Sequence, residues 1–272
     1  MASRPAQFRI NRNAPLAKGL VFAGMGGLNC SGTTLFADSS GYGNDATLIA
    51  SDAATGWVWN SSLARHGVNL AGPDRIDRIG RPAIGAARFT AAIWGIPNSP
   101  AAYRSIIAER ALGPKYANTW QILPNGRRRY YVALRNSANV SFATGLSAAV
   151  SNGVPTHFAF SFDGLTGILY INGSVATSLE ITGSYTGSAQ PLLISGNWDG
   201  QTWRGVVCDA MYWGRVLSPL EISALADPSN VMLSGLIVPR ATRRVFWYTE
   251  GGGDIIVPRQ IFSKRKASIY RR

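Results

Sequence analysis

The residues able to do acid–base or nucleophilic chemistry are few and scattered in this chain. The glutamates and histidines are Glu109, Glu180, Glu221, Glu250, His66 and His157. Hydrolysis of a glycosidic bond usually needs two carboxyl groups flanking that bond, and no glutamate shares an expected strand with a second acid. On its expected strand, Asp209 has Val207 and Met211 as same-face neighbours. With no Gly-x-Ser-x-Gly elbow, phosphate loop or Cys/His cluster either, the sequence predicts a protein that is not an enzyme.

Aromatic residues beside polar ones offer a different chemistry, the binding of sugars. The loop 195–203 holds Asn197 and Trp198 among glycines and hydroxyl or amide side chains, and Tyr185 and Tyr42 could join them. Trp203 begins an expected strand, so core packing is the better interpretation for it. The candidate glycan-binding residues are therefore Trp198, Asn197 and Tyr185.

The elements that would position these residues are most evident between His157 and Ser223. Phe158, Phe160 and Phe162 alternate with smaller residues and predict one apolar strand face. After a turn at Asp163-Gly164, the strand 168–171 ends in Asn172-Gly173, which favours a two-residue hairpin. The ranges 192–195 and 204–213 predict two further strands that form a second hairpin.

A short helix is expected directly after these strands. Ser218 can cap its first turn, Pro219 suits a position that needs no N–H, and Glu221 completes a capping box. We expect this helix to end near Ala226.

This order of elements resembles the C-terminal half of laminin-G-like domains in the concanavalin A-like superfamily. The segment 38–48, Asp-Ser-Ser-Gly-Tyr-Gly-Asn-Asp-Ala-Thr-Leu, is similar to an early loop of the same family. The resemblance implies an all-β fold, a concanavalin A-like jelly-roll β-sandwich with one short helix and extended terminal arms. The segments 15–21 and 245–247 further resemble laminin-G-like proteins encoded by tailed bacteriophages.

The resemblance also raises the question of calcium, which such domains often hold at a sandwich rim with oxygen ligands. Asp38 and Asp209 are the candidate ligands. In the alternative interpretation, which we favour, Asp38 caps its own turn and Asp209 pairs with a neighbouring arginine. No other cofactor is expected.

The net charge of +13 is concentrated at the two ends of the chain. Residues 1–18 carry +4 and residues 233–272 carry +7, which leaves only +2 for the segment between them. We therefore expect a basic N-terminal arm at 1–18, a sandwich at 19–232 and a basic, partly apolar C-terminal arm at 233–272. Arms of this charge are available to an acidic partner.

Apolar residues interleave with the charges of the C-terminal arm, and Gly251-Gly252-Gly253 forms a flexible joint before most of them. Such a pattern suits an arm that docks on a protein, so binding of nucleic acid by the tail is disfavoured. The basic triplet 127–129 follows a turn and is expected to be a solvated hairpin edge. The candidate partner-binding residues are Phe246, Trp247, Arg259, Phe262, Lys264, Arg265, Lys266 and Tyr270.

The chain shows no signal peptide and no segment that would span a membrane. Without a secretion signal, Cys30 and Cys208 are expected to stay reduced. We hypothesise a virion protein made in the host cytoplasm: a capsid decoration protein that forms a homo-oligomer and whose arms bind capsid or tail proteins of the same particle. The alternative hypothesis is a carbohydrate-binding adhesin of the tail or head that recognises host glycans.

Overall fold

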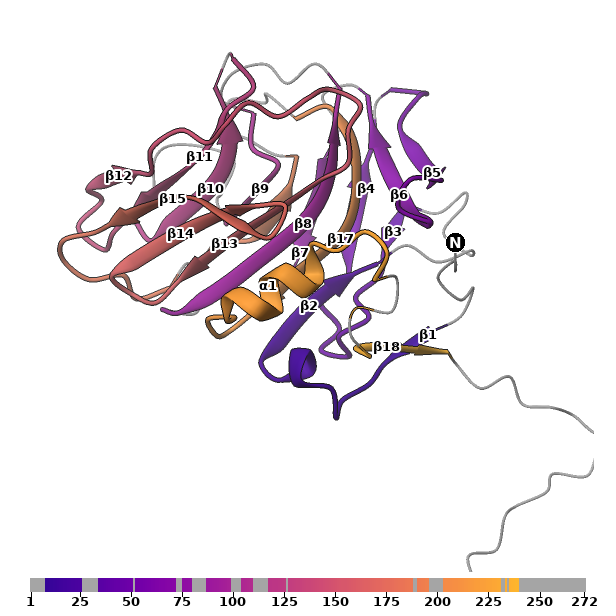
Figure 1. The fold of residues 1–272 in the computed structure, drawn as a ribbon, viewed down its shortest axis with the longest axis horizontal. Coiled ribbons are helices and arrows are strands. Elements are labelled where there is room, and N and C mark those ends of the chain that lie inside the picture. Colours follow the sequence, from indigo (N-terminus) through magenta and orange to yellow (C-terminus); the bar gives the residue numbers. More distant parts are fainter. Residues whose placement is uncertain are drawn as a thin grey trace, which may run out of the picture. The chain divides into compact units, whose positions relative to one another are not determined.

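The computed structural model describes residues 8–25, 34–50, 52–71, 75–79, 87–98, 104–109, 117–125, 127–187, 190–195, 203–230, 233 and 235–239. Figure 1 shows two layers of strands, with one α-helix beside them. The helices are η1 (Pro15–Ala17) and α1 (Pro219–Leu225). The strands are β1 (Phe8–Ile10), β2 (Leu20–Gly24), β3 (Leu35–Phe36), β4 (Ala46–Ile49), β5 (Gly56–Asn60), β6 (Arg65–Leu70), β7 (Arg75–Ile79), β8 (Phe89–Pro97), β9 (Ile107–Glu109), β10 (Thr119–Pro124), β11 (Tyr130–Arg135), β12 (Ser141–Ala143), β13 (Thr156–Phe162), β14 (Thr166–Ile171), β15 (Ser174–Glu180), β16 (Leu192–Ile194), β17 (Gly205–Trp213) and β18 (Ile237–Pro239).

The strands form two large antiparallel sheets and a small ribbon. The front sheet has the order β15-β14-β13-β8-β17-β6-β5, and β2 also pairs with β17. The back sheet has the order β12-β11-β10-β9-β16-β7-β4-β3, while β1 and β18 pair with each other. At one edge of the sandwich, Phe36 of the back sheet stacks on Trp57 of the front sheet with ring centroids 5.5 Å apart. The expected all-β sandwich with one short helix is thus the observed fold.

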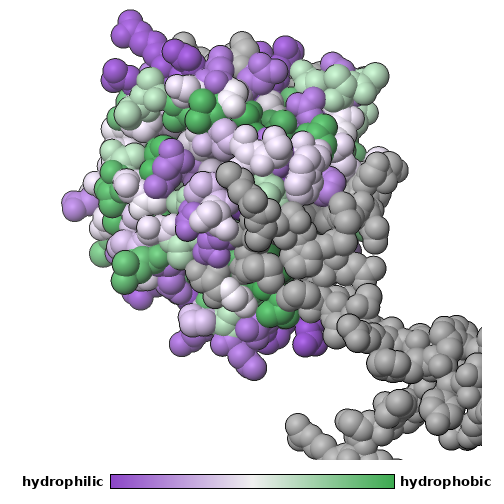
Figure 2. All heavy atoms as spheres, turned by 45° about the vertical axis from the view of Figure 1, so that its right-hand side comes forward, coloured by the Kyte–Doolittle hydropathy of each residue, from purple (hydrophilic) through white to green (hydrophobic). Residues whose placement is uncertain are grey.

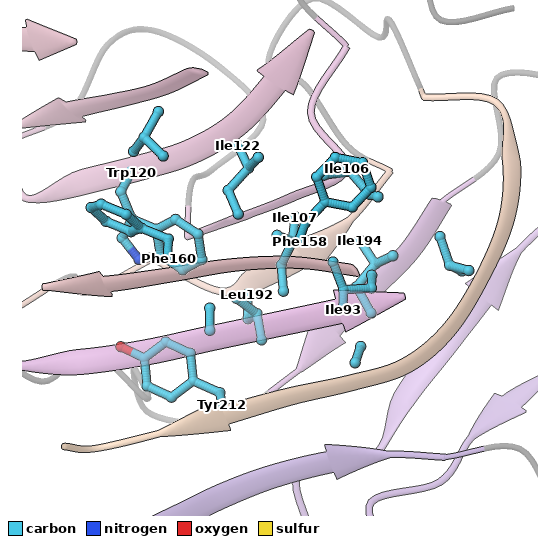
Figure 3. Packing of buried hydrophobic residues seen from close by; sticks show 14 of the residues in the cluster. Ile93, Ile106, Ile107, Trp120, Ile122, Phe158, Phe160, Leu192, Ile194 and Tyr212 are labelled. Carbon is cyan, nitrogen blue, oxygen red and sulfur yellow. The ribbon is translucent and has the colours of Figure 1, made fainter. Parts of the chain in front are cut away.

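The two sheets enclose a core rich in aromatic rings. Phe158 and Phe160 of β13 project from the front sheet toward Trp120 and Ile122 of the back sheet (Figure 3). Phe162 belongs to the same buried cluster, as the alternation along this strand predicted. Burying aromatic side chains of this size is the main source of stability in such a core.

The local turns and caps between 157 and 226 also match the sequence. Asn172 and Gly173 join β14 to β15 with φ of 50° and 79°, the left-handed conformation that the Asn-Gly pair tolerates. The Asp163 carboxylate accepts hydrogen bonds from two backbone N–H groups in the preceding turn. Ser218 and Glu221 form the complete capping box, and α1 ends with Ala226 as its C-cap.

The second hairpin is wrong, because β16 and β17 lie in different sheets. The strand that follows Asn172-Gly173 is β15, which alternation alone did not reveal. The expected geometry of β17 is also wrong at its centre. Asp209 has a φ of 46°, and the register shifts between Cys208 and Met211. This β-bulge interrupts the alternation of side chains, so Val207 lies in the sandwich core whereas Met211 belongs to a second cluster on the opposite face.

Parts of both expected arms pack as ordered structure. Leu16 is buried, and its carbonyl accepts a 2.7 Å hydrogen bond from the indole of Trp213. The β1–β18 ribbon places residues 8–10 beside residues 237–239. The chain divides into two units, Met1–Pro239 and Arg240–Arg272. The first unit therefore includes the predicted N-terminal arm, 1–18, and residues 233–239 of the predicted C-terminal arm. No helix within the described ranges has the length and apolar character to cross a membrane.

Candidate functional site

The outer face of the front sheet is largely covered. Met211 and Ala159 pack there with Ile222 and Leu225 of α1, and Leu16 of η1 joins the same cluster. Figure 1 shows α1 beside β17 and β2. Both described helices lie on the front sheet, so neither covers the outer face of the back sheet. That outer face is partly exposed on β10 and β11 and buried at Ala108 of β9.

A row of small and polar residues crosses the centre of that outer face. In the register of β11, β10 and β9, Gln121 has Ala133 on one side and Ala108 on the other. Trp120 and Ile122 point into the core, so the alternation of the strand places Gln121 on the outer face. Gln121 and Ala133 are partly exposed, whereas Ala108 is buried.

The Gln121 amide is held in one orientation. Ser105 Oγ donates a 2.7 Å hydrogen bond to Gln121 Oε1, which directs the two Nε2–H donors away from Ser105. Tyr131 is partly exposed and lies two residues before Ala133 on β11, on the same face and within reach as a diagonal neighbour of Gln121. We call Ser105, Ala108, Gln121, Tyr131 and Ala133 the Gln121 surface. It combines oriented amide donors with an aromatic ring, groups that together can bind sugar hydroxyls and the apolar face of a sugar ring.

A second aromatic site lies on the β5–β6 hairpin, and the sequence interpretation missed it. Trp59 is 49% exposed and contacts the ring of His66 edge-on, with centroids 5.0 Å apart. Partial burial lowers the pKa of His66. The signal was present in the run Gly-Trp-Val-Trp-Asn, because residues two apart share a strand face. Trp57 closes the core and Trp59 continues the same face into solvent.

A pocket of about 500 Å³ lies between the segment 148–156 and the β14–β15 turn. Its lining is uncharged and consists of Ala148, Ala149, Val150, Ser151, Val154, Thr156, Ile171, Asn172, Ser174, Val175 and Ala176. Without an aromatic or charged side chain, it offers less for recognition of a polar ligand than the Gln121 surface does. Figure 2 shows apolar and polar residues interspersed over the visible face, with no single large apolar area.

Asp209, a candidate calcium ligand, is instead part of a buried ion pair. Its carboxylate lies 2.5 Å from Nη1 of Arg65, and both side chains are fully buried. Arg65 also donates to the carbonyls of Leu63 and Pro228. A buried guanidinium at this distance disfavours a second cation, so Asp209 does not fit a calcium site, and the arginine pairing that we favoured is confirmed.

Asp38, the other calcium candidate, has both carboxylate oxygens engaged within its own loop. Oδ1 accepts hydrogen bonds from the N–H groups of Ala23 and Ser40. Oδ2 accepts from Ser40 Oγ and the N–H of Asn44. Asp38 thus orders its turn, as the alternative interpretation stated. Within the described ranges, no three His, Cys, Asp or Glu side chains gather into a possible metal site.

Two more titratable groups are buried where no ligand can reach them. His157 contacts Trp94 edge-on at 5.3 Å, and burial together with the charge of Arg65 lowers its pKa to about 3. Glu109 Oε2 accepts a 2.7 Å hydrogen bond from the indole of Trp120, and burial raises the pKa of Glu109 to about 8. Glu109 is therefore uncharged at neutral pH and turned toward the core.

Of the remaining predicted site residues, the structure describes two tyrosines, Tyr185 and Tyr42. Tyr185 is only 4% exposed and packs edge-on against Phe162, so its ring is part of the core and is not available to a glycan. Tyr42 is 63% exposed, with the guanidinium of Arg12 over its ring at 5.6 Å. The following predictions lie outside the described residues: Cys30, Asn197, Trp198, Phe246, Trp247, Arg259, Phe262, Lys264, Arg265, Lys266 and Tyr270.

The fold is that of a two-sheet, lectin-like jelly roll. The model of the laminin-G-like family described as the concanavalin A-like lectin/glucanases superfamily matches residues 77–223. Because this match covers more than half of the chain, the chain belongs to that family. No curated protein sequence matches the chain.

Several solved structures share the fold. Domain 4 of AbnA, an extracellular GH43 arabinanase from Geobacillus stearothermophilus solved with arabinotriose, has a TM-score of 0.61 and 17% identity over 76% of this chain and 98% of that one. The binding domain of Paraclostridial Mosquitocidal Protein 1 has a TM-score of 0.58 and 14% identity, over 79% and 53%. Trypanosoma rangeli sialidase has a TM-score of 0.56 and 17% identity, over 79% and 33%. At these identities the likeness establishes the fold alone.

Proposed function

We propose that this chain is a non-catalytic carbohydrate-binding domain that holds its ligand on the Gln121 surface. The observation that carries the proposal is the partly exposed Gln121 amide, which Ser105 fixes and two alanines flank on the face that neither described helix covers. A preorganised amide donates to sugar hydroxyls at a low entropic cost, because its orientation is already set.

The comparisons support this proposal over a purely structural role. A domain with the same fold was solved with arabinotriose, and the family description includes lectins. These findings favour the glycan-binding alternative that the sequence left open.

The placement of the carboxyl groups supports binding without turnover. Glu109, the acid on the strand beside Gln121, points into the core, and Asp209 forms a buried ion pair with Arg65. On the Gln121 surface as described, no carboxyl group stands ready to protonate a leaving oxygen, which glycoside hydrolysis requires.

The test compares wild-type protein with Gln121→Leu and Tyr131→Ala on an array of neutral and acidic glycans, followed by titration calorimetry with the strongest ligand. We expect each substitution to weaken binding about tenfold, the effect of losing one good hydrogen bond or one stacking contact. Trp59→Ala is the matched control and should bind as wild type does. Loss of binding in Trp59→Ala alone would place the site on the β5–β6 hairpin. If no glycan on the array binds the wild-type protein, the proposal is refuted.

A virion role remains a separate proposal, carried by the +7 charge of residues 233–272. In it, the C-terminal arm attaches the domain to capsid or tail proteins, and oligomerisation multiplies weak glycan contacts. Mass spectrometry of gradient-purified particles, with the full-length chain and with a chain ending at Ser234, tests it. Full-length protein in the particles that is lost on truncation is the expected result; particles without the protein would overturn it.

A further inference from the structure

One long segment of the chain contains cations but no acid, and its first three strands form one end of the back sheet. From residue 110 to residue 162 there is no aspartate or glutamate. The same segment supplies β10, β11 and β12, which include the centre of the Gln121 surface. Its cations are Arg110, Lys115, Arg127, Arg128, Arg129 and Arg135.

Two of these arginines belong to the same outer row as the Gln121 surface. Arg129 directly precedes β11 and Arg135 ends it, so strand alternation places both on the face of Tyr131 and Ala133. Over six residues of strand, the two positions are about 20 Å apart. The row therefore carries a positive charge at each end and a hydrogen-bonding centre between them.

Each of the two arginines has an asparagine as a hydrogen-bond partner. Arg135 Nη1 donates to the carbonyl and side-chain oxygens of Asn139 at 2.9 and 3.0 Å. The Asn125 side chain accepts a 3.0 Å hydrogen bond from the N–H of Arg129. The ion pairs found among the described residues involve Arg65 and Arg215 instead. No described carboxylate therefore forms an ion pair with Arg129 or Arg135.

The acids of the back sheet do not offset this charge either. Glu109 faces the core, and burial raises its pKa to about 8, so at neutral pH it carries no charge. Asp77 is on β7, three strands from β10, or about 14 Å across the sheet. Among the charges of the described back sheet, those nearest to the Gln121 surface are therefore positive.

We infer that the carbohydrate bound on the Gln121 surface is an anionic oligosaccharide or polysaccharide, with carboxylate or sulfate groups that reach Arg129 and Arg135. This inference rests on the proposed carbohydrate-binding function. Arginine suits the role because its planar fork donates two parallel hydrogen bonds to such groups. The separation of the two cations calls for a chain of several sugars and not for a single one.

A nucleic acid is the competing polyanion, and the surface fits it less well. Binding of single strands usually relies on several aromatic rings that stack successive bases. Tyr131 is the one aromatic side chain of the Gln121 surface, and alanines occupy the positions beside Gln121. Small residues and an oriented amide favour a hydroxyl-rich chain.

The test uses the full-length chain and polymers that differ in charge. Affinity electrophoresis or calorimetry at 0.05 M and 0.5 M NaCl compares polygalacturonate with its methyl ester, dextran sulfate with dextran, and single-stranded DNA. We expect the charged member of at least one pair to bind at least tenfold more tightly at low salt, and high salt to remove most of that difference. Polygalacturonate and dextran sulfate then distinguish a carboxylate from a sulfate ligand.

Variants separate this surface from the basic tail. Arg129→Gln should weaken binding of the anionic polysaccharide about two- to fivefold, the range for one exposed ion pair. Arg129→Lys keeps the charge and should reduce the affinity less. Arg9→Gln removes an exposed cation of the β1–β18 ribbon and should have no effect. Polyanion binding insensitive to Arg129 would assign it to another part of the chain and overturn the inference, as would DNA binding that responds to Arg129 more strongly than glycan binding does.

Equal binding of the charged and neutral members of each pair would also overturn the inference, yet leave the proposed function intact. A glycan array without any ligand, neutral or acidic, would instead refute the proposed function itself. The two failures therefore give different results.

Discussion

The buried carboxyl of Glu109 makes the stability of this fold depend on pH in an unusual direction. Burial raises its pKa from 4.5 to about 8, although Trp120 donates a hydrogen bond to it. The folded state therefore binds this proton more tightly than the unfolded state does. Its contribution to stability is fully present below about pH 4.5 and is lost as the pH rises toward 8.

The size of the effect follows from the shift. A difference of roughly 3.5 pH units corresponds to about 4 to 5 kcal/mol of unfolding free energy between pH 4 and pH 9, at 1.36 kcal/mol per unit. Glu109→Gln keeps a carbonyl oxygen for the Trp120 indole and cannot ionise. The variant should match wild type within about 1 kcal/mol near pH 5 and exceed it by about 4 kcal/mol at pH 9.

Urea unfolding followed by tryptophan fluorescence at pH 5, 6.5, 8 and 9 measures this difference directly. Taking the variant minus wild type at each pH cancels the titration of every other group. Glu180→Gln, the same substitution at an exposed residue of β15, is the matched control. A constant difference for Glu109→Gln would refute the reasoning, because it would mean that the carboxyl has a similar pKa in both states.

Two further substitutions test the ion pair and the hairpin. Asp209→Asn leaves the fully buried Arg65 without its carboxylate and should cost about 3 to 5 kcal/mol in urea unfolding; asparagine tolerates the positive φ of this position, so a loss below about 1 kcal/mol would contradict a role for the ion pair. Gly173→Ala places a Cβ 3.1 Å from Ser223 and Ala226 at a φ of 79° and should cost about 1 to 2 kcal/mol. Gly153→Ala, at a similar φ with open space around it, should lower the melting temperature less.

The sequence predicted those parts of the fold that depend on neighbours along the chain. The Phe158, Phe160 and Phe162 face, the Asn172-Gly173 turn and the Ser218 capping box are each determined by residues within a few positions of one another. All of them appear in the structure where they were expected. The family resemblance then supplied the two-sheet architecture that these local features do not specify.

Contacts between segments that are distant in the sequence could not be predicted from it. Arg65 and Asp209 are 144 residues apart, and no local pattern selects Arg65 from the other arginines. The bulge at Asp209 occurs where β17 changes its partner from β6 to β2, a change that belongs to the sheet and not to the strand. The expected alternation of side chains along β17 therefore failed at Asp209, one of the two candidate calcium ligands.

The Gln121 surface was missed for the same reason. Gln121 is an unremarkable polar residue in its own strand, and its significance comes from Ala133 and Ala108 on the flanking strands and from Ser105, sixteen residues away. The search for aromatic side chains instead selected Tyr185, which is buried in the core. Because the front sheet is covered by α1, η1 and their apolar cluster, evolution of new binding residues on the back sheet would leave that stabilising face untouched. Substitutions at Gln121 or Tyr131 should consequently change ligand binding with little effect on folding, whereas changes beneath α1 should do the reverse.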